Sequence, residues 1–421
     1  LPETTDFGII LKKLNYNELY TSIKYLIKNP KKRKILQING FKNVKHVTKI
    51  NSHEIDNIRE RIISDFKINY VKNKLRILNI YNLGQKLNHR LYNISLGKKF
   101  TNGFIRNGHD VLEISDRDFM KQNRVFGLRK VQDKFQEYLI ETFKNYNPNF
   151  LFFGHTNNIN LETLDALKNI NKNLIISQWN EDPIMPNLKD SKLNIDKILK
   201  YKNYTDHTFI TTDPSIFNKH DKSLKNIHFC FIPVDKNIES YEVYKLNPRN
   251  DLFYAMSHGV NRATLKKGKS DNRIHFLNNL IELMSNVNFD FYGFENKEPV
   301  WGNEFYKALV NSKMGLNLSR GLPTKYYSSN RIASITGNGL LTFIDKKTQL
   351  NKFFSNQEMI FYDNIHDLAD KINFYKKNDG IRKKIAYNGK KKYFKLFNET
   401  KITKYIIDCS IGKKTSLVWY L

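Results

Sequence analysis

The sequence predicts an α/β protein of two Rossmann-like domains that face one cleft, preceded by an N-terminal helical extension. Three observations support this fold class. Short apolar runs of strand length alternate along the chain with longer segments of helical periodicity, which is typical of parallel sheets with helical connections. Polar loops and glycine turns follow several of these runs. The 421 residues are enough for two or three domains with full hydrophobic cores.

The composition is strongly basic, with 70 Lys and Arg against 41 Asp and Glu, a formal net charge of +29 and a pI near 9.7. One interpretation is a polyanionic partner, either nucleic acid or an anionic membrane surface that carries lipid-linked molecules. The other is compositional bias, because Lys, Asn and Ile are abundant along the whole chain. We favour bias with a mild preference for membranes or phosphate, and a nucleic-acid partner is not expected.

Cysteine usage and hydropathy indicate the cellular compartment of the protein. Cys230 and Cys409 lie far apart without a CxxC spacing, which indicates a reducing compartment and argues against structural zinc. No run of about twenty apolar residues occurs, so no transmembrane helix is predicted, and the lysine-rich start lacks the apolar stretch of a signal peptide. We expect a cytoplasmic protein with peripheral contact at the inner face of the membrane. Residues 1–5 resemble a sortase-type tag remnant and are left out of the fold prediction.

Residues 1–74 are predicted as the helical extension. Apolar residues recur at helical spacing in Leu14–Ile27 and in Ile55–Ile68, and Pro30 and Gly40 are expected to break the helices. Part of this region recurs downstream at a constant offset of 349 residues. The residues Ile23, Lys28, Asn29, Arg33, Lys34, Asn39 and Gly40 return as Ile372, Lys377, Asn378, Arg382, Lys383, Asn388 and Gly389. This pattern indicates an internal repeat, with chance similarity of Lys/Asn-rich helices as the alternative.

Residues 75–240 are predicted as the first Rossmann-like domain. Its expected strands are Leu75–Tyr81, Val111–Ser115, Phe150–Phe153, Leu174–Gln178, Thr208–Thr212 and His228–Ile232. Its expected helices are Asn93–Asn107, Val131–Asn145 and Leu161–Asn169. The order of strand, glycine loop, helix, Gly108-His109 turn and strand is the start of a doubly wound sheet. The triplet Asp116-Arg117-Asp118 is interpreted as a surface loop rather than a metal-binding motif.

Three polar side chains follow strand ends of this domain. His155 follows one predicted strand, and Glu181 and Asp182 follow the next. Because parallel strands end at the same edge of a sheet, these side chains are expected to converge on the cleft. A carboxylate or imidazole there could take a proton from a hydroxyl group. Asp182 is equally consistent with a turn or helix cap before Pro183, and His155 with a structural or substrate-contacting role.

Residues 236–250 read as a linker, and residues 241–400 are predicted as the second Rossmann-like domain. Its expected strands are Leu252–Met256, Phe289–Tyr292, Met314–Leu318, Leu340–Ile344 and Met359–Tyr362. Its expected helices are Arg273–Leu283, Trp301–Val310, Asn330–Thr336 and His366–Lys376. A last helix at Thr400–Ile407 is expected to cross back to the first domain, in a C-terminal segment of residues 401–421.

Residues 313–345 are the most informative stretch of the second domain. Ser319, Arg320 and Gly321 directly follow a predicted strand, which is where ligands bind in an open α/β sheet. A helix that begins near Ser329 would add free backbone N–H groups and the positive end of a helix dipole. This combination suits a phosphate group.

The same stretch resembles the GT-B glycosyltransferases, and within them the spore-maturation, CgeB-like branch. Lys313–Arg320 is similar to the pattern Lys-x-Gly-Leu-Asn-x-Ser-Arg, and Arg331–Gly339 to the pattern Arg-x-x-Glu-x-x-Ala-x-Gly, before a Leu-Leu-Thr strand. Two residues depart from the pattern. Gly337 replaces the alanine, and Ser334 stands where the family usually has an acidic residue that contacts the donor sugar or ribose.

The resemblance covers roughly residues 75–408 and implies a nucleotide-sugar site in the second domain. Its members would be Gly259, Arg262, Lys267, Arg273, Gly293, Ser319, Arg320, Asn330, Arg331, Ser334, Gly337 and Gly339. Fixed cations, Arg320 and Arg331 among them, would stabilise the diphosphate as it leaves. The spacing of many GT-B enzymes assigns a further cation to Arg262 with Lys267, whereas the CgeB-like pattern assigns it to Arg273, and the sequence leaves both open. The turn at Gly293 would border the nucleotide base.

The resemblance also implies an origin for the internal repeat. The family carries a Lys-Asn-x-x-x-Arg-x-x-x-x-x-Asn-Gly pattern in its terminal helices, similar to that of the downstream copy. The upstream copy would then be the tail of a preceding transferase-like domain, or a duplicate of the helical element. A genuine repeat would make this chain a piece of a longer, tandem protein.

The resemblance implies an enzyme that transfers a sugar from a nucleotide-activated donor to a hydroxyl of a cell-surface glycan, a lipid-linked molecule or a protein. It implies no bound metal and no cofactor besides the nucleotide-sugar co-substrate. One alternative is a sugar-nucleotide epimerase or hydrolase with the same fold. Another is a non-catalytic basic polyanion-binding protein that lost the acidic contact at Ser334, since aromatic residues interleave with lysines in Lys391–Phe397.

Overall fold

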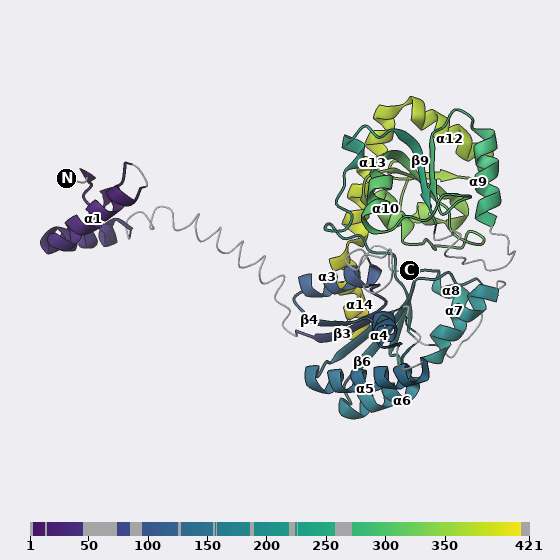
Figure 1. Cartoon of the computed structure of the whole chain (residues 1–421), viewed down its shortest axis with the longest axis horizontal. Coiled ribbons are helices and arrows are strands. Elements are labelled where there is room, and N and C mark those ends of the chain that lie inside the picture. The colour runs from purple at the N-terminus through teal and green to yellow at the C-terminus, as the bar shows by residue number, and fades with distance from the viewer. Residues whose placement is uncertain are drawn as a thin grey trace. The chain divides into compact units, whose positions relative to one another are not determined.

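The computed structural model describes residues 3–12, 15–44, 74–84, 95–124, 128–154, 156, 158–185, 189–218, 224, 226–256 and 272–413 (Figure 1). The chain divides into two compact units, Leu1–Val71 and Lys72–Leu421, and each is described separately. The predicted helix at Ile55–Ile68 lies outside the described residues. None of the described helices is long and apolar enough to cross a membrane.

The smaller unit begins with a short hairpin and a capped helix. Strand β1 (Glu3–Thr4) pairs antiparallel with β2 (Ile9–Ile10), and helix α1 (Tyr16–Lys28) follows. The side chain of Asn15 accepts a hydrogen bond of 2.9 Å from the backbone N–H of Glu18. This bond satisfies one of the N–H groups that a helix start leaves without an intrahelical partner.

A second helix of the smaller unit covers residues 30–44. Pro30 is its first residue, a position where the missing N–H of proline costs no hydrogen bond. Gly40 lies inside this helix, so the predicted break at Gly40 is wrong. The glycine instead permits close packing, because a Cβ at this position would lie 3.2 Å from the carbonyl oxygen of Phe7.

The larger unit contains two separate parallel sheets, and the first has six strands in the order β4-β3-β5-β6-β7-β8. The strands are β3 (Arg76–Tyr81), β4 (Asp110–Ile114), β5 (Phe150–Gly154), β6 (Ile175–Asn180), β7 (His207–Ile210) and β8 (Ile227–Phe229). The helices of this half are α3 (Leu96–Arg106), α4 (Asp116–Gln122), α5 (Leu128–Tyr146), α6 (Leu161–Ile170), α7 (Lys189–Lys200) and α8 (Pro214–Asn218).

The second sheet has five strands in the order β10-β9-β11-β12-β13. The strands are β9 (Asn250–Ala255), β10 (Phe289–Tyr292), β11 (Ser312–Asn317), β12 (Leu341–Asp345) and β13 (Ile360–Tyr362). The helices of this half are α9 (Asn272–Leu283), α10 (Gly302–Val310), α11 (Arg331–Gly337), α12 (Ile365–Lys377) and α13 (Asp379–Phe397). All neighbouring strands in both sheets are parallel. The predicted α/β fold with two Rossmann-like domains is confirmed.

Both faces of the first sheet are covered, which explains its continuous apolar strands. In β5, Phe150 and Phe152 pack in the cluster that contains residues of α3, while Leu151 and Phe153 pack in the cluster that contains residues of α5 and α6. The side-chain amide nitrogen of a polar residue inside β3 is also paired. The amide of Asn79 donates to the carbonyl oxygen of Gly97 at 3.2 Å and to the hydroxyl of a threonine in α3 at 2.9 Å.

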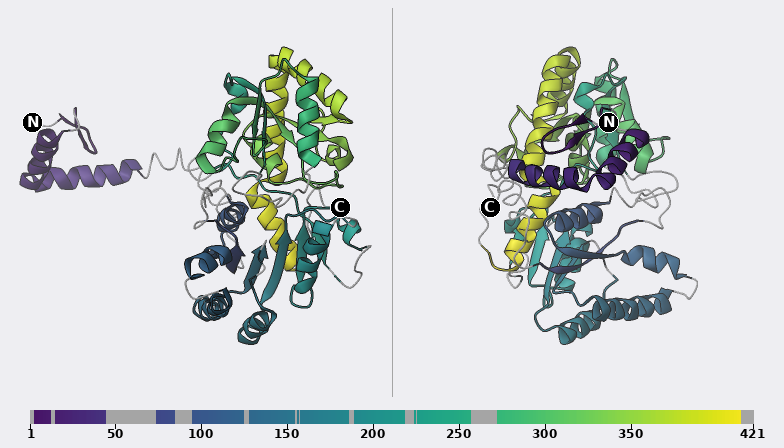
Figure 2. Two further views of the ribbon diagram at one scale, coloured as in Figure 1. Left: turned by 45° about the vertical axis from the view of Figure 1, so that its right-hand side comes forward. Right: turned by 90° about the vertical axis from the view of Figure 1, so that its left-hand side faces the viewer.

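The last described helix joins the two halves of the larger unit. Helix α14 (Glu399–Ser410) follows α13 of the second half and packs against α3 and β7 of the first (Figure 2). The hydroxyl of Ser410, in α14, lies 2.8 Å from the hydroxyl of Ser177, in β6. Arg106 of α3 forms ion pairs with Glu399, at the start of α14, and with Asp235 at 3.0 Å.

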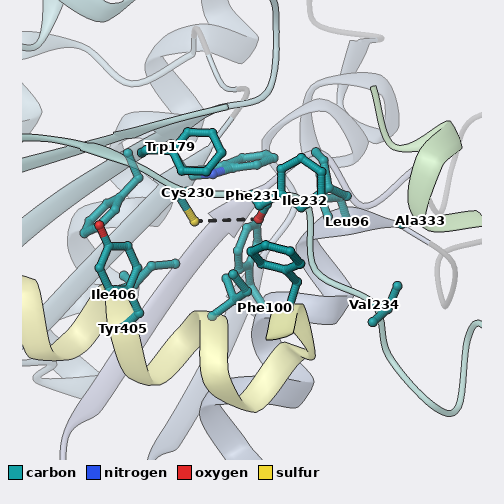
Figure 3. Close-up of a cluster of buried hydrophobic side chains, with 14 of the residues drawn as sticks. Leu96, Phe100, Trp179, Cys230, Phe231, Ile232, Val234, Ala333, Tyr405 and Ile406 are labelled. Atoms are coloured by element: carbon teal, nitrogen blue, oxygen red, sulfur yellow. Dashed lines mark hydrogen bonds between the residues drawn. The ribbon is translucent and has the colours of Figure 1, made fainter. Parts of the chain in front are cut away.

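A cluster of buried aromatic side chains lies at this junction (Figure 3). It brings together Phe100 of α3, Trp179 of β6, Phe231 after β8 and Tyr405 of α14. The rings of Phe100 and Trp179 are 5.0 Å apart in an edge-on arrangement. Because this core contains residues of both halves, including Ala333 of α11, apolar burial holds the two halves together.

The interpretation of Asp116-Arg117-Asp118 as a surface loop is wrong. These residues form the first turn of α4, and the carboxylates of Asp116 and Asp118 are both buried. Asp116 accepts hydrogen bonds from the hydroxyl of Thr156 and, at 2.8 Å, from the amide of Asn158. A carboxylate can be buried when it is fully hydrogen-bonded, and these partners come from a loop about forty residues away in the sequence.

Candidate active site

A cavity of about 480 Å3 lies between the two halves of the larger unit. Its walls come from the carboxyl ends of strands β3, β6 and β9 and from helices α3, α10 and α11. The lining residues are Tyr81, Asn82, Leu83, Gly84, Ser95, Leu96, Arg117, Glu181, Asp182, Glu239, Ala255, Met256, Val300, Trp301, Gly302, Phe305, Tyr306, Tyr327, Ser329, Asn330, Arg331 and Ser334. Its size and position fit a small-molecule site in an open α/β sheet.

Arg331, the first residue of α11, is held at one wall of this cavity. Its Nε donates to the carbonyl oxygen of Ala255 at 2.9 Å. Its Nη1 donates to the carbonyl oxygen of Leu318 at 2.8 Å and to the hydroxyl of Ser329 at 3.1 Å. Ala255 ends β9 and Leu318 follows β11, the two strands between which the strand order of the second sheet reverses. The guanidinium is therefore fixed at the crevice where such sheets bind ligands.

The guanidinium of Arg331 also contacts an aromatic ring. It lies 4.7 Å from the ring centroid of Tyr254, a cation–π contact. Tyr327 lines the same cavity, and burial raises the pKa of its hydroxyl. Asp182 and Glu181 raise the pKa of Tyr327 further, while Arg331 and Arg273 act in the opposite direction. The carboxylates of the first half and the guanidinium groups of the second thus act in opposite directions on the pKa of the same buried hydroxyl.

The carboxylates lie on a turn that directly follows β6. The backbone N–H of Asp182 donates to the side-chain oxygen of Asn180 at 2.8 Å. The hydroxyl of Thr211 donates to the carbonyl oxygen of Glu181 at 3.1 Å, which ties the turn to the end of β7. The side chain of Asn180 thus accepts a hydrogen bond from the backbone of this turn. Both Glu181 and Asp182 line the cavity.

Two polar groups at the end of β3 also face the cavity. Burial raises the pKa of the Tyr81 hydroxyl, Glu181 and Asp182 raise it further, and Arg117 lowers it. Within the described part of the chain, the hydroxyl of Tyr81 and the side-chain oxygen of Asn82 are buried without a hydrogen-bond partner. Such groups are costly unless they gain a partner, so both are suited to bind a polar ligand.

Glu239 forms the floor of the cavity, and its carboxylate is held in a buried ion pair behind the cavity wall. Nζ of Lys99, in α3, lies 2.5 Å from the carboxylate of Glu239, and both side chains are almost completely buried. The same Nζ donates to the carbonyl oxygen of Pro233 at 3.1 Å and to the side-chain oxygen of Asn330 at 3.2 Å. Burial raises the pKa of Glu239, and Lys99 opposes this effect. The lysine thus links both halves at the base of the site.

The structure brings five of the predicted site residues to the cavity wall. These residues are Glu181, Asp182, Asn330, Arg331 and Ser334. Arg273, in the first turn of α9, does not line the cavity but is close enough to lower the pKa of Tyr327. The predicted residues His155, Gly259, Arg262 and Lys267 lie outside the described residues.

The remaining predicted residues do not line the cavity. Ser319 and the exposed Arg320 follow β11, and Gly293 follows β10 with a positive φ of 67°. Gly337 permits close packing, because a Cβ there would lie 2.7 Å from Cγ of Glu239. Gly339 has a positive φ of 80°, a conformation that favours glycine. Both glycines therefore have a structural role in positioning α11.

Several residues that line the cavity or lie behind its wall carry no signal in the sequence. Lys99 is one of many lysines, and its partner Glu239 lies 140 residues away. Tyr327 stands in a segment without strand or helix periodicity, Trp301 is only the first residue of a predicted helix, and Arg117 belongs to the triplet that we interpreted as a surface loop. Only the fold brings these residues together. Among the described residues, no group of three or more His, Cys, Asp or Glu side chains could hold a metal ion.

Comparisons with known proteins agree with this geometry. Residues 272–408 match a family model described as glycosyl transferase-like. This region contains α9 to α14 and thus most of the second half of the larger unit. No curated protein matches the sequence.

Solved structures share the fold at low sequence identity. An α-glucosyltransferase in complex with UDP and a 13-mer DNA containing a HMU base has a TM-score of 0.58 at 12% identity, over 80% of this chain and 100% of that chain. Sucrose-phosphate synthase from Thermosynechococcus elongatus has a TM-score of 0.52 at 10% identity, over 80% and 99%. HepE of Anabaena, in complex with UDP and glucose, has a TM-score of 0.50 at 11% identity, over 79% and 98%. The chain has the GT-B glycosyltransferase fold.

Proposed function

We propose that this chain transfers a glycosyl group from a nucleotide-activated sugar to a hydroxyl group of an acceptor. The observation that carries this proposal is the cavity with Arg331 fixed at the carboxyl ends of β9 and β11 and with two carboxylates at the end of β6. The glycosyl transferase-like family model and the GT-B fold support the same class of reaction. UDP is present in two of the three solved structures named above.

The proposed division of roles follows from charge. Arg331, with Arg273 nearby, would bind the diphosphate and stabilise the negative charge that builds on it when its bond to the anomeric carbon breaks. Asp182 or Glu181 would take the proton from the acceptor hydroxyl as its oxygen bonds to the anomeric carbon. Fixed guanidinium groups can neutralise the leaving group without a metal ion. Chelators should therefore leave the rate unchanged.

We assign the chain to the CgeB-like branch on the pattern in Lys313–Arg320 and Arg331–Gly339. Ser334 takes the place of the acidic residue of that pattern and lines the cavity, and its hydroxyl lies 3.4 Å from the carbonyl oxygen of Asn330. Because serine cannot supply the charge of a carboxylate, we expect the donor sugar or ribose to bind differently here than in that branch.

The net charge of +29 favours an acceptor on an anionic carrier. We propose a cell-surface glycan, a lipid-linked molecule or a protein as the acceptor, with the chain at the inner face of the membrane. A DNA acceptor is a second candidate, because the similar α-glucosyltransferase was solved with a 13-mer DNA. Transfer to DNA should fall steeply with salt, whereas transfer to an uncharged glycan should not.

The test is a thermal-shift screen against nucleoside diphosphates and nucleotide sugars, UDP and UDP-glucose among them. A ligand at 100 times its Kd stabilises the folded state by about 2.7 kcal/mol. Arg331→Ala should abolish the shift. Arg249→Ala is the matched control, because Arg249 is exposed and precedes β9, at the end of the strand opposite the cavity. Absence of a shift with every nucleotide, or a shift that survives Arg331→Ala, would contradict the proposed donor site.

A second measurement separates transfer from the other reactions of this fold. Product analysis by mass spectrometry should show sugar release that depends on an added acceptor. Release of free sugar without an acceptor would indicate a hydrolase, and conversion of the nucleotide sugar into an isomer would indicate an epimerase.

A further inference from the structure

The helix pair of the smaller unit repeats, element by element, a helix pair of the larger unit. α1 has Asn15 as its N-cap and Asn29 as its C-cap, and α12 has Asn364 and Asn378 in the same places, 349 residues later. The following helices begin at residue 30 and at residue 379, again 349 residues apart. The helix bounds thus agree with the sequence repeat at every described position.

The two copies also pack in the same way against the chain that precedes them. A Cβ at Gly389 would clash with the carbonyl oxygen of Glu358, which lies shortly before β13 and α12. A Cβ at Gly40, the equivalent glycine, would lie 3.2 Å from the carbonyl oxygen of Phe7, shortly before α1. In both copies a glycine in the second helix lets it approach backbone at the entry to the first. Chance similarity of lysine-rich helices would not reproduce this contact.

The copies differ in what covers them. Leu368 and Ile372 of α12 are completely buried, in contact with α9 and the strands of the second sheet. The equivalent residues of α1, Leu19 and Ile23, are 45% and 48% exposed. The first copy therefore has the apolar residues of a sheet-packing helix, but the described residues of its own unit contain no parallel sheet.

The exposed residues form one continuous face of α1. Tyr16, Leu19, Tyr20, Ile23 and Ile27 are all exposed, and their spacing places them on one side of the helix, here called the α1 stripe. Ser22, which lies outside this stripe, is buried. A stripe of this kind is typical of a surface that another structure covers.

The second helix of the pair shows the same contrast through a charged residue. Arg382 of α13 is completely buried, and its Nη1 donates to the carbonyl oxygen of Lys313 at the start of β11. Its equivalent in the first copy, Arg33, is exposed. Arg382 thus binds the backbone of a strand in the downstream copy, and Arg33 occupies the equivalent position in the upstream copy.

We infer that residues 15–44 are the closing helix pair of a second α/β domain of the same type, whose parallel sheet precedes them in the polypeptide and covers the α1 stripe. The order follows from the downstream copy, in which β9 to β13 all precede α12. In that domain Arg33 would donate to a carbonyl oxygen of the strand that corresponds to β11. On the proposed function, the polypeptide would then carry a second domain of the type that binds the nucleotide sugar, upstream of the first.

Cysteine accessibility tests this inference. Ile23→Cys introduces a thiol into the α1 stripe, and Thr21→Cys is the control, because Thr21 and its equivalent Asp370 are both exposed. Cys230 and Cys409 are both buried, so the native background is low. Maleimide labelling is measured in this chain and in the polypeptide extended upstream along its own reading frame by one domain, on the order of 150 residues.

The inference predicts that both variants react at similar rates in this 421-residue chain, and that the extension slows Ile23→Cys at least tenfold while Thr21→Cys stays unchanged. Protection of Ile23→Cys in this chain alone would overturn it, because the larger unit or a second copy would then cover the stripe. Equal labelling with the extension, or an upstream frame without alternating strands and helices, would also overturn it. Hydrogen exchange of α1 in the unsubstituted proteins gives the same comparison without relying on either variant.

Discussion

The two sheets of the larger unit share one strand order but differ in the charges that follow their strands. β4-β3-β5-β6-β7 and β10-β9-β11-β12-β13 are the same doubly wound arrangement. On the second sheet, the cavity wall carries Arg331, which two backbone carbonyls and a hydroxyl hold in place. On the first, it carries Glu181 and Asp182 on a turn after β6. The loops at the strand ends, rather than the fold, therefore decide what each wall can bind.

The largest expected effect separates the two walls by kinetics. Asp182→Asn removes a candidate base of the first wall while keeping the size of the side chain, so turnover should fall by about 10²- to 10⁴-fold. The nucleotide-dependent thermal shift should remain, because that binding is assigned to Arg331. Initial rates of nucleoside diphosphate release measure the effect, with Asp133→Asn, an exposed residue of α5, as the control. Equal loss of nucleotide binding in Asp182→Asn and Arg331→Ala would break the comparison.

The next expected effect concerns the buried ion pair of Lys99 and Glu239, which lies between the two walls. Lys99→Met leaves the buried carboxylate of Glu239 without its partner, which should destabilise the fold by about 3–5 kcal/mol. Urea unfolding measures this change. The double variant Lys99→Met/Glu239→Met should recover much of the loss, since it buries no unpaired charge. If the single and double variants lose the same free energy of unfolding, the loss does not come from the unpaired charge of Glu239.

The sequence predicted the sheets better than the site. Apolar runs placed every strand of both sheets to within a few residues, because strands buried on both faces leave a continuous signal. The resemblance of Arg331–Gly339 to the GT-B pattern named Arg331, which lines the cavity, whereas Ser319 and Arg320, which follow β11, do not line it. The pairing of Lys99 with Glu239 could not be predicted, since nothing local marks either residue. The burial of Asp116 was missed because its partners Thr156 and Asn158 lie in another loop.

The smallest expected effect is acid sensitivity of the first half. Burial lowers the pKa of His109 from 6.5 to about 4, and its Nδ1 accepts a hydrogen bond of 3.1 Å from the N–H of Leu75. The unfolded chain takes up a proton near pH 6.5, whereas the folded chain resists it until about pH 4. The stability that neutral His109 contributes is therefore fully present above pH 6.5 and falls by about 3 kcal/mol as the pH drops to 4.

Replacement of this histidine tests the assignment. His109→Gln keeps an acceptor for the N–H of Leu75 but cannot take up a proton in this range. Unfolding free energies between pH 7 and 4 should therefore fall less steeply for the variant than for the native chain. Parallel curves for the two proteins would mean that His109 does not contribute to the acid sensitivity.

The most direct test of the central claim is a crystal structure of the chain with a nucleoside diphosphate bound. The account predicts density for the diphosphate in the cavity of about 480 Å3 between the two sheets, within hydrogen-bond distance of the Arg331 guanidinium. The carboxylates of Glu181 and Asp182 should face the side of the cavity that the diphosphate leaves open. A diphosphate bound elsewhere on the chain, with no contact to Arg331, would contradict the account.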